Sequence, residues 1–122
     1  MYPFVINGDV WRVARVHAGD PSLIDRTDTP RLAVTDARDR TVYVRTDLTP
    51  PLLDRVVLHE VAHAITVSWG LLPDVRSGVM RGDIIDVEEW AAQLVENHAL
   101  EAVQAASRAL GRPICVRGLC SD

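Results

Sequence analysis

The first half of the chain alternates apolar and polar residues in short runs, a pattern that predicts β-strands. Residues 4–6 and 10–16 flank Asn7 and Gly8. Asn-Gly tolerates the positive φ angles of a two-residue hairpin turn, so these two runs predict a hairpin. The polar, turn-prone residues 17–30 that follow predict a connecting loop.

A second hairpin is predicted from residues 31–36 and 41–45, which are separated by a short polar turn. The second of these runs is rich in β-branched side chains, which favour strands. Four short strands thus precede the middle of the chain. We expect them to form one small antiparallel sheet.

The apolar spacing then lengthens and predicts a helix. Thr49 is a candidate N-cap, and Pro50 suits the first helical position because its missing amide hydrogen costs nothing there. We expect this helix to run to about Trp69 and to stop at Gly70. Apolar residues surround its axis from Val56 onward, which is typical of a helix buried on all sides.

A second long helix is predicted from about Val87 to Leu110, ending at Gly111, after a connection (residues 71–83) whose two glycines make it a candidate flap. On a helical wheel, the apolar residues of this segment form one stripe. The stripe comprises Ala91, Ala92, Val95, Ala99, Ala102, Val103, Ala106 and Leu110. Together with the strands, the two helices predict an α+β fold, a small antiparallel sheet packed on two long helices.

Composition narrows the class of protein. A chain of 122 residues predicts one domain spanning residues 1–122. The formal charge of -4, from 13 basic and 17 acidic residues, argues against a nucleic-acid partner. The N-terminus lacks the pattern of a signal peptide and no apolar run is long enough to span a bilayer, so we expect a cytoplasmic protein with no membrane partner. Cys115 and Cys120 are expected to form a local disulfide or to remain thiols.

Candidate chemistry lies within the first helix, where residues 59–63 read His-Glu-x-x-His. His59 and His63 fall one turn apart on one helical face and can share a divalent metal, and Glu60 can act as general base toward water. The alternative is two hydrogen-bonded core histidines with Glu60 paired to an arginine. We favour a metal because three polar groups in an otherwise apolar helix need a shared partner.

The second helix offers the third protein ligand that a catalytic zinc site requires. Glu88 falls near the middle of the apolar stripe, where a lone carboxylate needs a cation. Glu89 lies about 100° away and suits a capping box with Asp86 as N-cap. We therefore favour Glu88 over Glu89, with Asp83 and Asp86 as more distant candidates.

Three segments of the chain resemble the ImmA/IrrE metallopeptidases and related small phage and bacterial zincins: residues 41–44, 56–64 and 87–94. The resemblance implies a minimal zincin-like metallopeptidase fold in which Zn²⁺ is held by His59, His63 and Glu88. In that family a Glu-x-x-Ala stretch on a later helix supplies the third ligand, which maps onto Glu88. The implied role of Glu60 is that of the catalytic base.

These residues predict a zinc-dependent peptidase that acts on a protein or peptide substrate. An extended substrate is expected to pair with the edge of the sheet at residues 41–45. Candidates for stabilising the oxyanion are Tyr43, Arg45, Arg76 and Arg81. The alternatives are a zinc-stabilised protein-binding module or inactive metallopeptidase relative, and an interaction protein with no metal.

Overall fold

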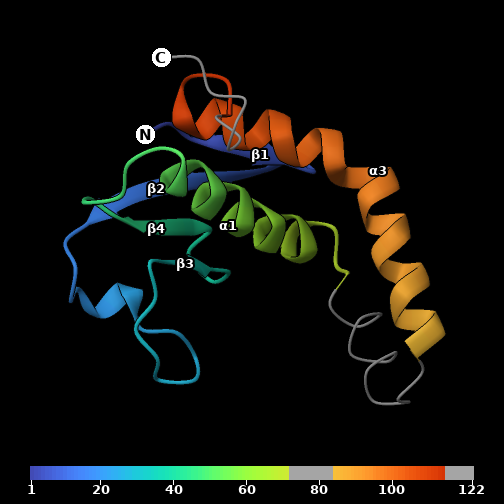
Figure 1. Cartoon of the computed structure of the whole chain (residues 1–122), viewed down its shortest axis with the longest axis horizontal. Coiled ribbons are helices and arrows are strands. Elements are labelled where there is room, and N and C mark those ends of the chain that lie inside the picture. The colour runs from blue at the N-terminus through green and yellow to red at the C-terminus, as the bar shows by residue number, and fades with distance from the viewer. Residues whose placement is uncertain (72–83, 115–122) are drawn as a thin grey trace.

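The computed structural model describes residues 1–71 and 84–114, apart from the side chains of residues 84–88. In chain order the elements are β1 (Phe4–Ile6), β2 (Asp9–Val16), the short 3-10 helix η1 (Pro21–Leu23), β3 (Ala33–Asp36), β4 (Thr41–Arg45), α1 (Leu52–Ser68) and α3 (Ile84–Leu110) (Figure 1). This order confirms the predicted α+β class. Among these described elements, neither long helix is apolar enough over a sufficient length to cross a membrane. The predicted flap and both cysteines fall outside the described ranges.

Both predicted hairpins are present. Strands β1 and β2 pair antiparallel around Asn7 and Gly8, whose φ angles of 47° and 82° suit a two-residue hairpin turn. Strands β3 and β4 also pair antiparallel, with Ala33 opposite Val44. Local turn chemistry and alternation were therefore sufficient to predict each hairpin.

The sheet as a whole is mixed, so the prediction of an all-antiparallel sheet was wrong. Its strand order is β1-β2-β4-β3, and β2 pairs parallel with β4, with Arg12 opposite Thr41. The long connection after β2 has room to carry the chain past the position of β4, so that β3 forms the outer strand. The more apolar β4, with buried Val42 and Val44, takes the interior position.

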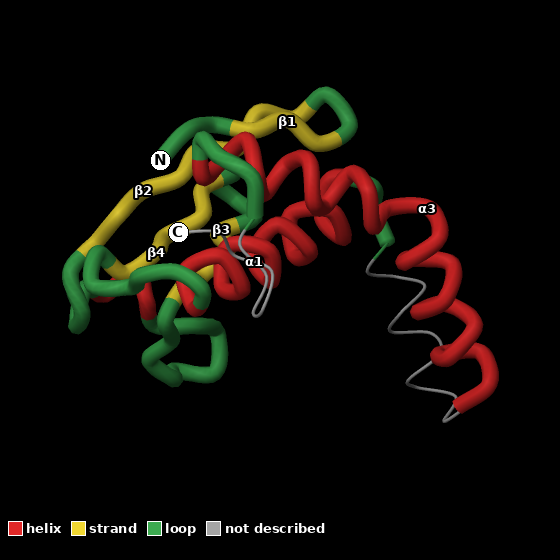
Figure 2. Tube along the Cα trace, turned by 45° about the horizontal axis from the view of Figure 1, so that its top comes forward, coloured by secondary structure: helices red, strands yellow, loops and turns green. Residues whose placement is uncertain are grey.

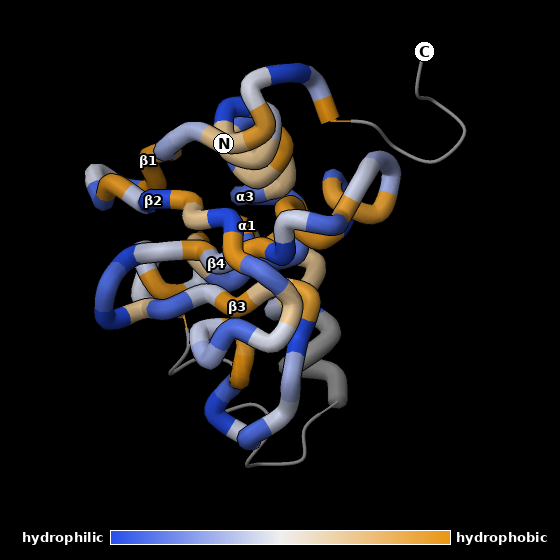
Figure 3. Tube along the Cα trace, turned by 90° about the vertical axis from the view of Figure 1, so that its left-hand side faces the viewer, coloured by the Kyte–Doolittle hydropathy of each residue, from blue (hydrophilic) through white to orange (hydrophobic). Residues whose placement is uncertain are grey.

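Both helices cover the same face of the sheet (Figure 2). Helix α1 contacts β1, β3 and α3, and α3 also contacts β1. A view turned by 90° shows α1 between α3 and the strands β3 and β4 (Figure 3). The core beneath the helices includes Phe4, Ile6, Trp11, Val42, Val44, Val57, Val61, Ala64 and Ile65. The indole N–H of Trp11 donates to the hydroxyl of Ser68 at 2.9 Å, which ties the sheet to the end of α1.

The start of α1 differs from the prediction, because Thr49 does not cap the helix with its side chain. The helix begins at Leu52 after Pro51, and no side-chain hydrogen bond caps it. Thr49 and Pro50 each precede a proline, and a residue in that position is disfavoured in the helical region. Its end agrees with the prediction: Gly70 has a φ of 65°, and the amide of Leu71 donates to the carbonyl of Thr66 at 2.9 Å.

Helix α1 is not buried on all sides, in contrast to the prediction. Its inner face carries Leu53, Asp54, Val57, Glu60, Val61, Ala64 and Ile65. Arg55, His59, Ala62 and His63 are exposed. The run of small apolar residues around the motif therefore reflects a half-buried helix in which alanine occupies part of the outer face.

The apolar stripe predicted for α3 is also largely wrong. Val95 and Val103 are 64% and 45% exposed, and Ala91, Ala92 and Ala99 are exposed as well. The less exposed side chains recur at Trp90, Leu94, His98, Ala102, Ala105, Ala106 and Ala109. Among its described side chains, the buried ones are those of Ala105, Ala106 and Ala109, so small side chains let the last turns of α3 pack closely on the core. The first part of α3 extends beyond the sheet (Figure 1).

An ion pair between buried Asp54 and half-buried Arg112 joins the start of α1 to the residues after α3. Both guanidinium Nη groups of Arg112 donate to the carboxylate oxygens of Asp54 at 2.6 Å, and Asp54 is 0% exposed. The bond to Asp54 raises the pKa of Arg112 further above its high ordinary value, so the guanidinium is charged at any physiological pH. This bidentate contact fixes the end of α3 against α1.

Candidate metal site on helix α1

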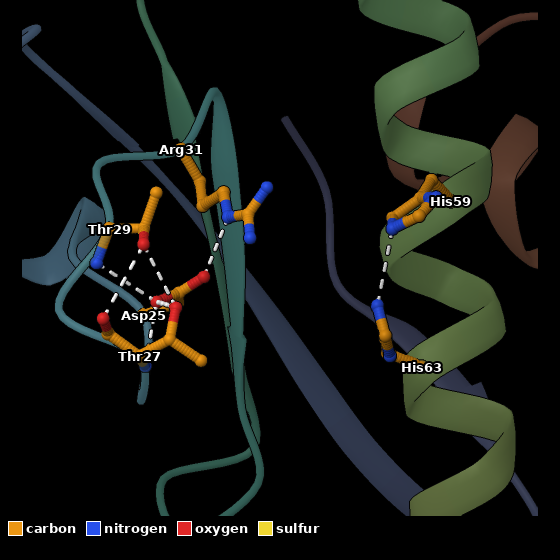
Figure 4. A network of polar contacts seen from close by, with 6 residues as sticks. All are labelled: Asp25, Thr27, Thr29, Arg31, His59 and His63. Carbon is orange, nitrogen blue, oxygen red and sulfur yellow. Dashed lines mark hydrogen bonds and ion pairs between the residues drawn. The ribbon is translucent and has the colours of Figure 1, made fainter.

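The two histidines of the motif meet on the outer face of α1. Their Nε2 atoms are 3.2 Å apart, and the rings lie edge to face at 71° with centroids 4.9 Å apart (Figure 4). Both side chains are exposed. The helical repeat alone brings His59 and His63 onto one face, and the two rings direct their Nε2 atoms toward each other.

This spacing fits a shared zinc ion. Two nitrogen ligands about 2.05 Å from a tetrahedral zinc ion lie roughly 3.3 Å apart. The observed separation of 3.2 Å matches that requirement without any movement of the helix. The same distance also suits a hydrogen bond between the two imidazoles when no metal is bound.

Glu60 lies on the inner side of the motif and is only 6% exposed. Its Oε2 atom accepts a hydrogen bond from the hydroxyl of Thr35 at 2.7 Å. Within the described residues no arginine bonds to Glu60, in contrast to the arginine pairing of the non-metal alternative. One ligand atom from each of His59, Glu60 and His63 lies within 4.8 Å of the others, so imidazole and carboxylate groups converge on one small volume.

Thr35 is a site residue that the sequence did not reveal. It lies on β3, and its side chain shares a face with Ala33, whose side chain is buried toward α1. Its hydroxyl also lies 3.2 Å from the backbone carbonyl oxygen of Glu60. Alternation along β3 predicts which face Thr35 occupies, but only the packing of β3 against α1 identifies Glu60 as its partner.

The backbone of Thr35 faces the open edge of the sheet. The amide of Arg45 donates to the carbonyl of Leu32 at 3.1 Å, which makes Leu32 and Arg45 a hydrogen-bonded pair. Because such pairs alternate in an antiparallel ladder, Val34 also bonds to β4, and the peptide groups of Ala33 and Thr35 point outward. No further strand of the described chain pairs with this side of β3.

The proposed third ligand belongs to α3. Glu88 lies within this helix, but its side chain is among those left undescribed, as is that of Asp86, and Asp83 falls in the gap before the helix. Glu89 is exposed.

Helix α3 meets the end of α1 at His98 and Glu101, and its first part points away from the middle of α1 (Figure 1). Glu88 precedes His98 by about 15 Å of helix. The described part of the chain therefore does not bring Glu88 to His59 and His63, and the case for this residue rests on the Glu-x-x-Ala resemblance alone.

A separate cluster connects the end of α1 to the middle of α3. The indole of Trp69 donates to Oε1 of Glu101 at 3.0 Å, and its ring centroid lies 5.3 Å from that of His98. Nδ1 of His98 is 3.3 Å from the other carboxylate oxygen of Glu101. This contact fixes the point from which the first part of α3 extends.

Neither of the two described oxyanion candidates, Tyr43 and Arg45, is brought to the site. On β4 the buried Val42 and Val44 face α1, so Tyr43 and Arg45 project from the opposite face of the sheet. Arg45 also pairs with Asp47. Arg76 and Arg81 lie in the undescribed segment before α3.

The site therefore consists, in the described part of the chain, of two exposed imidazoles on α1 and a buried carboxylate held by an edge strand. Comparison with known proteins does not assign the chain to a family. No protein-family model, no curated protein and no solved structure matches this chain.

Proposed function

We propose that this chain is a zinc-dependent peptidase that hydrolyses a peptide bond of a specific protein substrate. One observation carries the proposal: the Nε2 atoms of His59 and His63 are 3.2 Å apart, with the carboxylate of Glu60 adjacent to them. That donor set and spacing suit zinc. The exposure of both imidazoles leaves the site open to water and to an extended peptide.

The residues divide into ligands and a base. His59 and His63 would hold the metal, and Glu88 would serve as the third ligand once the first part of α3 is drawn toward the middle of α1. A bound zinc ion supplies Lewis acidity toward water and toward a substrate carbonyl. Glu60 would accept the proton of the attacking water with Oε1, because Oε2 is occupied by the hydroxyl of Thr35.

The substrate is best placed along β3. The predicted strand, β4, is an interior strand and has no free edge, so that prediction was wrong. The outward-facing peptide groups of Ala33 and Thr35 offer hydrogen bonds to an added strand. Because Thr35 also contacts Glu60, a peptide paired with β3 would run beside the proposed base.

A library experiment tests the proposal. Protein loaded with zinc is incubated with a complex peptide library, and new termini are identified by mass spectrometry. We expect cleavage at a restricted set of sequences that stops when a chelator removes the metal. A protein that binds zinc but cleaves nothing would instead favour a zinc-stabilised binding module.

A further inference from the structure

The carboxylate of Asp25 accepts several hydrogen bonds from the loop before β3. Oδ1 of Asp25 accepts from the amide and hydroxyl of Thr27 at 2.8 Å and 2.6 Å, and from the amide of Thr29 at 3.1 Å. These bonds, together with a bond from Arg31, hold the pKa of Asp25 well below its usual range. Asp25 is therefore ionised at neutral pH and organises the whole turn (Figure 4).

Arg31 is anchored to this turn at one nitrogen only. Its Nε donates to Oδ2 of Asp25 at 2.6 Å, and its side chain is 55% exposed. In the described part of the chain its two Nη groups have no hydrogen-bond partner. The guanidinium is thus oriented by Asp25 while two of its nitrogens remain available, an arrangement suited to binding a second carboxylate.

The position of Arg31 relates it to the proposed peptide site. It lies two residues before β3, and Leu32 between them still pairs with β4, because the amide of Arg45 donates to its carbonyl. Figure 4 shows its guanidinium directed from the turn toward the side of α1 that carries His59 and His63. At no more than about 3.3 Å per residue, Arg31 lies within roughly 13 Å of Thr35 along the chain.

We propose that Arg31 is a specificity-determining residue that binds a carboxylate of the peptide substrate, about four residues from the position opposite Thr35. The inference rests on the proposed function, since it assumes that the peptide pairs with β3. The carboxylate belongs either to an Asp or Glu side chain or to the C-terminus of the peptide. Arg31 recognises the substrate and takes no part in bond cleavage.

The test uses zinc-loaded protein carrying Glu60→Gln, so that peptides bind without being cleaved. The probe is a positional-scanning peptide library in which one position is fixed as Glu or Gln and the others are randomised. One arm has amidated C-termini and the other has free C-termini, which separates the two sources of carboxylate. Arg31→Gln is compared with Arg26→Gln, which removes the same charge from an exposed position in the same loop.

We expect peptides with Glu, or with a free C-terminus, to bind about fivefold more tightly than their neutral counterparts, since an exposed ion pair has a modest effect. Arg31→Gln should abolish this preference, Arg31→Lys should retain part of it, and Arg26→Gln should leave it intact. Equal binding of charged and neutral peptides, or no binding of either, would contradict the inference, as would a preference that survives Arg31→Gln.

Cleavage by the wild-type protein distinguishes failure of the proposed role of Arg31 from failure of the peptidase proposal. If the wild type cleaves peptides but shows no dependence on a carboxylate, the role of Arg31 is wrong and the peptidase proposal stands. If the Arg31-dependent preference is present but the zinc-loaded wild type cleaves nothing, the peptidase proposal fails and Arg31 remains a carboxylate-binding residue.

Discussion

The hydroxyl of Thr35 donates a 2.7 Å hydrogen bond to the carboxylate of Glu60, across 25 residues of sequence. The contact joins the outer strand of the sheet to the helix that carries the candidate metal ligands. It satisfies one oxygen of a carboxylate that is only 6% exposed, and no other described residue bonds to the second oxygen. The strand proposed to bind the peptide thus also orients the proposed base.

Replacing Thr35 with valine preserves the shape of the side chain and removes the donor. We expect Thr35→Val to lower the free energy of unfolding by about 1–3 kcal/mol, because a buried acceptor loses its partner. We also expect kcat to fall about tenfold, since the base is less well oriented. Urea denaturation and peptide cleavage measure the two effects. Thr35→Ser keeps the hydroxyl and should restore both, and a Thr35→Val protein with wild-type kcat would show that the contact is only structural.

The metal site predicts one zinc ion per chain. At free zinc about 100 times its Kd, binding should raise the free energy of unfolding by about 2.7 kcal/mol, and a chelator should reverse the change. His59→Ala and His63→Ala should each abolish this response. His17→Ala removes a histidine from an exposed position in the first loop and should not. Unchanged metal content in the His59 and His63 variants would exclude the site.

The third ligand is tested by two adjacent substitutions. Glu88→Gln should weaken zinc binding by more than the roughly 10- to 100-fold typical of losing an outer-shell partner. Glu89→Gln changes the same charge at an exposed position and should leave affinity unchanged. Isothermal titration with zinc gives both affinities. The reverse order would assign the ligand to Glu89, and equal affinities would place it elsewhere.

The ion pair between Asp54 and Arg112 predicts a stability effect remote from the metal. Arg112→Met should cost about 2–4 kcal/mol of unfolding free energy, because the carboxylate of Asp54 stays buried after losing its bidentate partner. Zinc affinity should be unchanged. Arg108→Met, at an exposed position in the last turn of α3, is the matched control and should be nearly neutral in urea denaturation.

Local features of the fold were predictable because each depends on neighbouring residues. Asn7 and Gly8 specify a turn, and Gly70 and Gly111 end helices with positive φ angles. The order of the strands was not predictable from local sequence, because it depends on how the long connection after β2 places β3 outside β4. The inward face of α3 was also missed, because alanine-rich spacing indicates several faces and packing against α1 selects one.

The candidate site also combines features that the sequence predicts with features that only the fold reveals. Helical repeat places His59 beside His63 from sequence alone, and the 3.2 Å spacing agrees with that expectation. Thr35 and Arg31 carry no recognisable motif. They become relevant only once β3 lies against α1 as the outer strand, which is a consequence of long-range packing.

The most direct test of the central claim compares peptide cleavage by zinc-loaded wild-type protein with that by the Glu60→Gln variant. Removing the carboxylate's basicity should abolish cleavage while zinc content and the urea denaturation midpoint remain close to wild type. Cleavage that persists in the zinc-loaded Glu60→Gln variant at the wild-type rate would contradict the assignment of Glu60 as the base, and with it the proposed peptidase site.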